Sequence, residues 1–195
     1  NGLLYMPPHQ CFCYPGVKIG GFNALAGHRE KRRGESSEAR LMKGPAWNAV
    51  SGEERITAED WPCFRHDGKR SGSCRTRTPE KPAERWRIAP GGKLTQPVVS
   101  GDALYVCATD RHEVMCFDVS TGEKRWAFTA GGRVDSPPSC AQGRVFFGCA
   151  DGCVYALRAS DGALAWKFRA APHDTRIVSF GQLESPWPVH GSVLI

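Results

Sequence analysis

Apolar and polar positions alternate in short runs between residues 97 and 128. These runs are four to six residues long and are separated by breaks rich in Gly, Asp, Ser and Thr. The runs are Pro97–Ser100, Ala103–Ala108, Glu113–Asp118 and Lys124–Phe128. A period of two is typical of half-buried strands, and no segment here keeps a helical period. The pattern therefore predicts four short strands.

The same pattern returns about 40 residues later along the chain. Trp86, Trp126 and Trp166 are spaced 40 residues apart, and Gly122 and Gly162 each precede a Trp by four positions. Asp-Gly pairs, such as the one ending at Gly162, supply the backbone angles that tight hairpin turns need. A four-stranded antiparallel unit that repeats at this length predicts the blades of a β-propeller.

We therefore expect an all-β fold, a partial β-propeller with two complete four-stranded blades and fragments of others. The blades are predicted at about residues 97–128 and 139–168. Trp126 and Trp166 are expected to be mostly buried, at equivalent places between sheets.

The rest of the chain is divided by its composition. Residues 1–27 are interpreted as the remnant of a preceding blade, 28–59 as a linker with few contacts to the sheets, and 60–195 as propeller repeats. A third blade is expected to start near 191–195, and Trp86–Ala89 to form a lone outer strand. On this interpretation the chain is a piece of a longer protein.

The net charge of +6 does not alter the predicted fold or its division into segments. Much of the excess lies in His28–Lys43, which mixes both signs and contains no aromatic residue. Because stacking on bases needs aromatic side chains, we favour a solvated linker there over a nucleic-acid-binding arm. No apolar run approaches the 18 residues of a membrane-spanning helix. A secretory signal is neither seen nor excluded.

The stretch from Cys116 to Trp126 resembles the docking motif of the pyrroloquinoline-quinone-like (PQQ-like) propeller repeats. That motif is Ala-x-Asp-x-x-Thr-Gly-x-x-x-Trp. Asp118, Thr121, Gly122 and Trp126 match it, and Cys116 stands in place of the Ala. In that family the Trp of one blade packs against the next blade, which implies a structural role for these residues.

The second repeat keeps part of this motif. Ala156, Gly162 and Trp166 match, whereas Arg158 and Asp161 stand where Asp and Thr are expected. The docking residues that the resemblance implies are Trp86, Asp118, Gly122, Trp126, Gly162 and Trp166. The chain most resembles the large exported propeller proteins of planctomycete-type bacteria within this family. It resembles the outer-membrane assembly lipoprotein propeller more distantly.

A quinone cofactor is the chemistry that this family suggests first. In its quinoprotein dehydrogenases the quinone lies between a vicinal Cys-Cys disulfide and a Trp, beside a calcium ion. This sequence has no vicinal Cys pair and no recognisable set of calcium ligands. We therefore expect no cofactor within these residues, with pyrroloquinoline quinone kept as the alternative for blades outside them.

Nine cysteines leave several interpretations open. His9, Cys11 and Cys13 alternate, so they would share one strand face as metal ligands, as packed thiols or as a disulfide. Cys63 and Cys74 are candidates for a disulfide if the protein is exported. No catalytic residue can be named, because no nucleophile lies at a suitable spacing from a base.

These observations favour a non-catalytic propeller scaffold or binding module of the cell envelope, periplasmic or extracellular. Its partner would be a protein or an unknown ligand, and not nucleic acid. Part of a quinone-dependent oxidoreductase, with its site on blades outside this chain, is the alternative. A sensor or receptor ectodomain is a third possibility, so the sequence leaves open whether the protein is an enzyme.

Overall fold

A computed structural model describes residues 3–6, 23–26, 37–48, 57–179 and 181–195. The chain divides into two compact units, residues 1–36 and 37–195. In the first unit, β1 (Leu3–Met6) pairs antiparallel with β2 (Asn23–Ala26), from Leu3 opposite Ala26 to Met6 opposite Asn23. The interpretation of residues 1–27 as a blade remnant stays a prediction.

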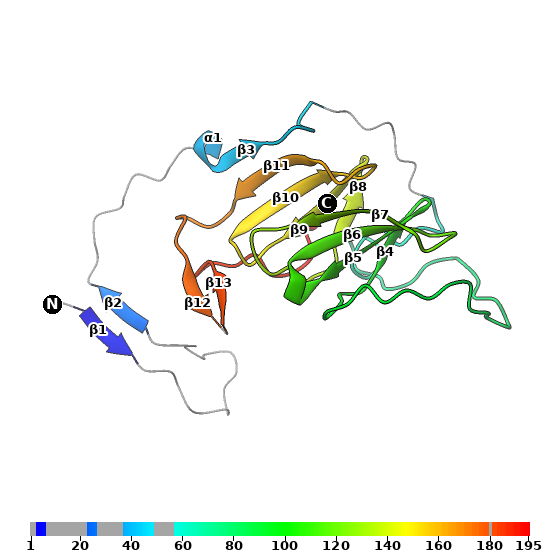
Figure 1. Cartoon of the computed structure of the whole chain (residues 1–195), viewed down its shortest axis with the longest axis horizontal. Coiled ribbons are helices and arrows are strands. Elements are labelled where there is room, and N and C mark those ends of the chain that lie inside the picture. Colours follow the sequence, from blue (N-terminus) through cyan, green and yellow to red (C-terminus); the bar gives the residue numbers. More distant parts are fainter. Residues whose placement is uncertain (1–2, 7–22, 27–36, 49–56, 180) are drawn as a thin grey trace. The chain divides into compact units, whose positions relative to one another are not determined.

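The first complete blade is a sheet of four strands in sequence order (Figure 1). The strands are β4 (Val98–Ser100), β5 (Ala103–Ala108), β6 (Glu113–Asp118) and β7 (Lys124–Thr129). The turn from β5 to β6 contains a short 3-10 helix, Thr109–Arg111. All neighbouring strands are antiparallel, so each turn joins adjacent strands directly.

The second blade repeats this order and gains one strand. Its strands are β8 (Ser139–Ala141), β9 (Arg144–Gly148), β10 (Cys153–Arg158) and β11 (Leu164–Arg169). A fifth strand, β3 (Leu41–Lys43), pairs antiparallel with the outer edge of β11 after the four-residue helix α1 (Ser37–Arg40). The all-β propeller fold is confirmed, with five strands rather than four in this blade.

The main core lies between the two sheets. Side chains that alternate along the strands of both blades meet there, because every second residue of a strand points to the same face. The largest fully buried members are Tyr105, Phe147, Leu157, Val98, Val114, Val134 and Val145. Cys107, Cys116, Cys140, Cys149 and Cys153 are also buried in this cluster, where they pack as small apolar side chains.

Each blade also has a second apolar face. On the first blade, Val106, Met115 and Phe117 form a cluster against which Ile88 packs. On the second, the cluster contains Ala156 and Ala165. Segments outside the repeats therefore contribute to covering both sheets.

Fewer strands than expected are seen at the ends of the repeats. Residues 191–195 form no strand, and Ser139 Oγ donates to the carbonyl of Val193 at 2.6 Å; the start of a third blade there stays a prediction. Trp86–Ala89 likewise forms no strand. A hairpin of β12 (Ile177–Ser179) and β13 (Gln182–Glu184), which the pattern did not predict, follows the second blade.

The expected linker also differs from the structure within its described part. Lys43 lies opposite Trp166 in the β3–β11 ladder, and Ala46 is only 1% exposed. Because His28–Lys43 mixes charges of both signs, the sequence pattern did not predict that Leu41–Lys43 would pair with the edge of a sheet. The residues 28–36 and 49–56 of that expected linker lie outside the described residues.

Candidate functional site

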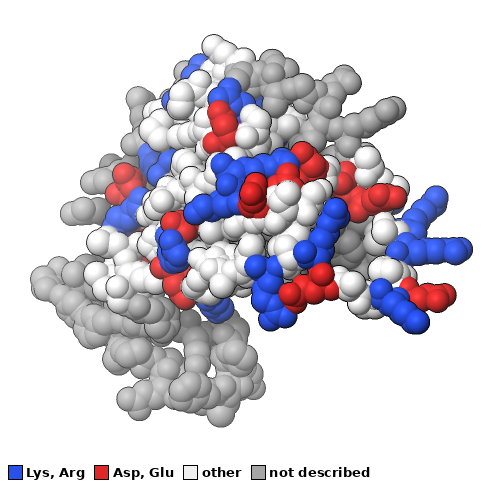
Figure 2. All heavy atoms as spheres, turned by 45° about the vertical axis from the view of Figure 1, so that its right-hand side comes forward, with Lys and Arg blue, Asp and Glu red and all other residues white. Residues whose placement is uncertain are grey.

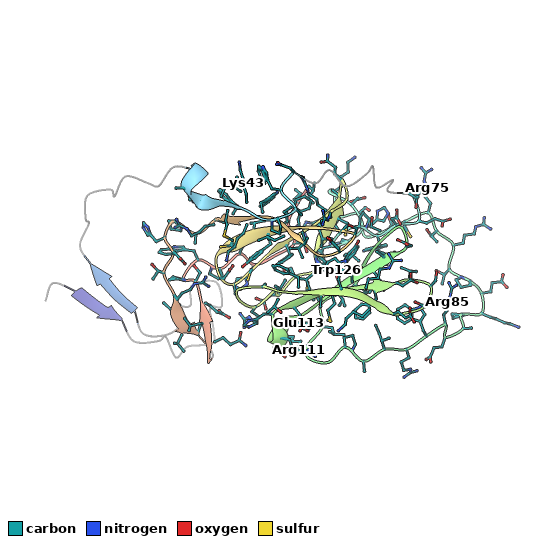
Figure 3. All side chains as sticks on the ribbon, turned by 45° about the horizontal axis from the view of Figure 1, so that its top comes forward. Lys43, Arg75, Arg85, Arg111, Glu113 and Trp126 are labelled. Atoms are coloured by element: carbon teal, nitrogen blue, oxygen red, sulfur yellow. The ribbon has the colours of Figure 1, made fainter. Side chains whose placement is uncertain are left out.

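Trp126 joins the two sheets. Its side chain lies between them (Figure 3), 8% exposed, and its indole Nε1 donates to the carbonyl of Ala159 at 2.9 Å. A Cβ atom on Gly162 would lie 2.6 Å from the ring, and the backbone of Gly162 has a φ of 72°. Only glycine fits both conditions, so the Gly and the Trp of successive repeats form one contact.

Trp86 makes the same contact with the first blade. Its Nε1 donates to the carbonyl of Val119 at 2.8 Å, and a Cβ on Gly122 would lie 2.8 Å from its ring. Both indole hydrogen bonds span 33 residues, so the contact recurs with the repeat. Trp86 is half-buried and thus more exposed than Trp126.

Trp166 differs from the expectation that it would match Trp126. It is half-buried and lies on the outward face of the second blade, beside the ring of Phe146 with centroids 5.9 Å apart. Its position in the sequence repeat is equivalent, but among the described residues no further sheet packs over it.

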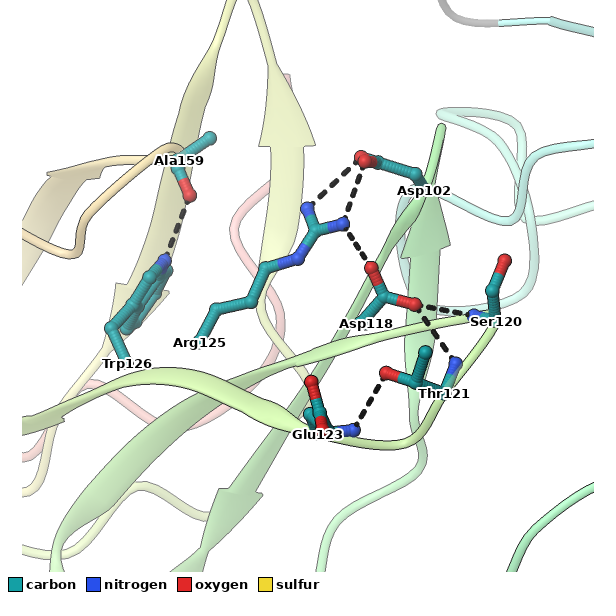
Figure 4. Close-up of polar contacts among 8 residues, drawn as sticks. All are labelled: Asp102, Asp118, Ser120, Thr121, Glu123, Arg125, Trp126 and Ala159. Carbon is teal, nitrogen blue, oxygen red and sulfur yellow. Dashed lines mark hydrogen bonds and ion pairs between the residues drawn. The ribbon is translucent and has the colours of Figure 1, made fainter.

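Asp118 shapes the turn between β6 and β7 (Figure 4). One carboxylate oxygen accepts hydrogen bonds from the backbone N–H groups of Ser120 at 2.7 Å and Thr121 at 2.9 Å. The other pairs with Arg125, which also contacts Asp102 through two nitrogens, at 3.1 and 2.6 Å. The Arg125 guanidinium and the two backbone bonds lower the pKa of Asp118 to about 2.

The second blade replaces this turn with a different pair. Arg158 and Asp161 stand where the family has Asp and Thr, and they form an ion pair with Nε to Oδ1 at 2.9 Å. Asp161 also accepts from the N–H of Ala163 at 3.1 Å. The two residues that depart from the motif thus bind each other, and Gly162 still lies against the Trp126 ring.

Asp151 stands in a predicted turn, but its side chain is fully buried. Its Oδ2 accepts from the Tyr155 hydroxyl at 2.6 Å and from Lys167 Nζ at 2.8 Å. Burial would raise the pKa of Asp151, but the hydrogen bonds from Lys167 and Tyr155 outweigh it and hold the pKa below the usual value. The sequence carried no signal for this, because Lys167 follows 16 residues later on another strand.

The buried thiols are poor nucleophiles. Burial raises the pKa of Cys107 and Cys116 to about 12 and that of Cys153 to about 11. The thiolate is the reactive form, so these cysteines are packing residues at neutral pH. Cys63 and Cys74 are both free thiols, so the disulfide considered for them is not formed in this structure.

The metal candidates His9, Cys11 and Cys13 lie outside the described residues. Within the part of the chain that the structure describes, no three His, Cys, Asp or Glu side chains are grouped so that they would hold a metal ion. No helix there is long and apolar enough to cross a membrane.

Known proteins share this arrangement of repeats. The PQQ_2 family model, described as "Outer membrane protein assembly factor BamB", matches residues 71–186. The chain belongs to this family. The match covers both complete blades and the indole contacts of Trp86 and Trp126, so the resemblance to PQQ-like propellers is confirmed.

Individual relatives cover short stretches. The outer membrane protein assembly factor BamB of Nitrosomonas eutropha is 29% identical over 97 residues, 50% of this chain and 24% of that protein. BamB from Moraxella catarrhalis is 25% identical, with a TM-score of 0.39 over 44% of this chain and 26% of that one. The quinohemoprotein alcohol dehydrogenase of Comamonas testosteroni is 21% identical, with a TM-score of 0.49 over 64% and 21%. The chain thus spans about a quarter of the length of these proteins.

Charges of both signs alternate on the surface shown in Figure 2. Many are paired, as Arg125 is with Asp102 and Arg111 with Glu113, where Nε and Oε2 are 3.1 Å apart. Arg75 and Arg85 lie on the extended segment that precedes the first blade, away from the sheets (Figure 3). On the face drawn, the cations do not gather into one continuous patch.

Proposed function

We propose that this chain is a non-catalytic propeller module that binds other proteins in the cell envelope. One observation carries the proposal: the motif residues serve packing and turn formation. Gly122 and Gly162 each lie against an indole, that of Trp86 and that of Trp126, and Asp118 holds the turn of the first blade. None of these groups is left to hold a cofactor.

The family supports the compartment and the kind of partner. The relatives' description names the assembly of outer-membrane proteins, and this likeness points to the envelope and to protein partners. The raised pKa values of the buried thiols, such as Cys107, argue against a covalent mechanism built on them.

A quinone titration tests the non-catalytic half of the proposal. The purified chain is mixed with pyrroloquinoline quinone and calcium, and bound quinone is measured by equilibrium dialysis together with dye-linked oxidation of alcohols. We expect neither stoichiometric binding nor turnover. Stoichiometric binding together with turnover would contradict the proposal and favour the quinone-dependent oxidoreductase.

A binding assay tests the protein partner. A fluorescently labelled, unfolded outer-membrane β-barrel protein is titrated with the chain, and anisotropy is followed against an unfolded water-soluble protein as control. We expect saturable binding of the barrel protein only. Equal binding of both proteins, or of neither, would contradict a role in the assembly of outer-membrane proteins.

A further inference from the structure

The outer edge of the second blade carries a strand that does not belong to the repeat. β3 continues the sheet at β11, with Leu41 opposite Phe168 and Lys43 opposite Trp166. Among the described residues, no strand pairs with the outer edge of β7, the corresponding strand of the first blade. The added strand is therefore a feature of one edge and not of the blade architecture.

Three residues, Arg40, Gly44 and Ala46, attach this segment to the edge of β11. Arg40 donates to three successive carbonyls, those of Arg169 at 2.8 Å, Ala170 at 2.6 Å and Ala171 at 3.2 Å. Its guanidinium carbon also lies 5.2 Å from the centroid of the Phe168 ring. Arg40 thus anchors the start of the segment to the end of β11.

Gly44 and Ala46 anchor the other end. Their N–H groups donate to the carbonyls of Ala165 at 2.8 Å and Leu164 at 2.9 Å. A Cβ on Gly44 would lie 2.2 Å from the Leu164 carbonyl oxygen, so no larger residue fits there. Ala46 is almost fully buried beside Ala156 and Ala165, so a larger side chain would have to displace its neighbours.

The strand between these anchors is short and open to solvent. It has three ladder residues, and Met42 is 53% exposed. Short segments with little buried apolar surface open at a low free energy compared with the core of a protein. The edge beneath them then presents unpaired backbone groups, which accept another strand readily.

We propose that the outer edge of β11 is a binding site for an extended segment of a partner protein with the pattern Arg-x-x-x-Gly-x-Ala, and that residues 40–46 occupy this site in the free chain. In strand addition, backbone hydrogen bonds supply affinity and small side-chain sites supply selectivity. Here the three carbonyls select the Arg, the close approach selects the Gly, and the cluster around Ala156 selects the Ala. The proposal rests on the protein-binding function above and names one kind of partner.

The test uses the full chain with Gly44→Val, which cannot approach Leu164. We expect amide exchange at Ala46 and at the residue in position 44 to accelerate at least about tenfold, a loss of at least about 1.4 kcal/mol of local protection. A labelled peptide of residues 39–48 should then bind this variant at least about tenfold more tightly than the wild-type chain, whose site is occupied. Met42→Ala, on the same strand but exposed, is the matched control and should behave like the wild type.

Peptides with Gly44→Val or Arg40→Ala should not bind the released edge. If the Gly44→Val chain loses the rest of its fold, the Arg40→Ala chain serves instead, since it frees the same segment without a clash. Fast exchange without peptide binding would overturn the proposal, and so would unchanged exchange in both variants. A dimer of the released variant, seen by light scattering, would overturn it in favour of strand exchange between two copies. If the peptide fails while the β-barrel protein still binds, only this site is wrong.

Discussion

The contacts of single residues in this protein are dominated by glycine and tryptophan acting together. Gly162 and Trp126 come from different repeats, yet each is fitted to the other. The glycine supplies a positive φ and an absent Cβ, and the indole supplies a large apolar face and one N–H donor. The pair therefore holds a turn and an interface between sheets at once.

Comparing Gly162→Ala with Gly101→Ala separates the effect of the indole contact from that of the positive φ. We expect it to lower the free energy of unfolding by about 1–3 kcal/mol more than Gly101→Ala does, because only at Gly162 does the new methyl group meet the indole. Gly101 also has a positive φ, but no other side chain or backbone atom lies within 4 Å of the place that its Cβ would take. Urea denaturation measures both variants, and equal losses would mean that the indole contact adds nothing.

Asp118 should titrate at an unusually low pH. Its pKa is about 2 in the folded chain against 3.8 for the free side chain, so its ionised form favours folding. This stabilisation is present above about pH 4 and is lost as the pH falls towards 2. Carbon-detected NMR of the carboxyl group measures the midpoint. Arg125→Gln should move it upwards, and an unchanged midpoint would show that Arg125 is not the cause.

Strands β10 and β11 are joined by an ion pair as well as by their ladder. Asp151 precedes β10 and Lys167 lies on β11. The carboxylate also accepts from the Tyr155 hydroxyl and from the N–H of Cys153 at 3.0 Å, and Arg176 Nη2 lies 3.9 Å from it. Such a pair contributes little net stability compared with an apolar core, but removing Asp151 leaves the buried Tyr155 hydroxyl and the half-buried Lys167 without this acceptor. This makes the pair sensitive to substitution.

Asp151→Ala should destabilise the protein by about 1–3 kcal/mol, because the buried Tyr155 hydroxyl loses its acceptor and the half-buried Lys167 loses its partner. The exposed pair of Arg158 and Asp161 is the control, and Asp161→Ala should change stability little. Thermal unfolding followed by circular dichroism compares the two. A loss at Asp151 no larger than at Asp161 would contradict a buried role for this carboxylate.

Beyond its single strands, the unit of residues 37–195 is held together by one core that both blades share. Tyr105 of the first sheet and Phe147 and Tyr155 of the second belong to the same buried cluster. A sheet separated from its neighbour would expose this whole face to water, and the hydrophobic effect opposes that. The two blades are therefore expected to unfold together.

Phe147→Ala tests this coupling. The substitution should cost about 3–5 kcal/mol and should reduce amide protection in β5 and β6 as much as in β9 and β10. Hydrogen exchange with mass spectrometry resolves the two sheets. Met42→Ala, at an exposed position of β3, should change neither sheet. A loss of protection confined to the second blade would mean that each blade is stable by itself.

The amino-acid sequence by itself determined the repeat unit. Alternating side chains and Gly-rich turns specify short antiparallel strands through local geometry, and the 40-residue spacing of Trp86, Trp126 and Trp166 specifies their recurrence. The Gly and Trp of the docking motif could be selected in the same way, since both recur with the repeat. Such features depend on residues close in the chain or equivalent in each copy.

Only the tertiary structure decided what happens at edges and in buried polar positions. β3 pairs with β11 more than 120 residues away, Val193 accepts a hydrogen bond from Ser139, and the buried Asp151 binds Lys167. These outcomes depend on which edge is free and which charge is near after the sheets have packed. Neither hydrophobic period nor charge pattern contains that information, because both describe neighbours in sequence and not neighbours in space.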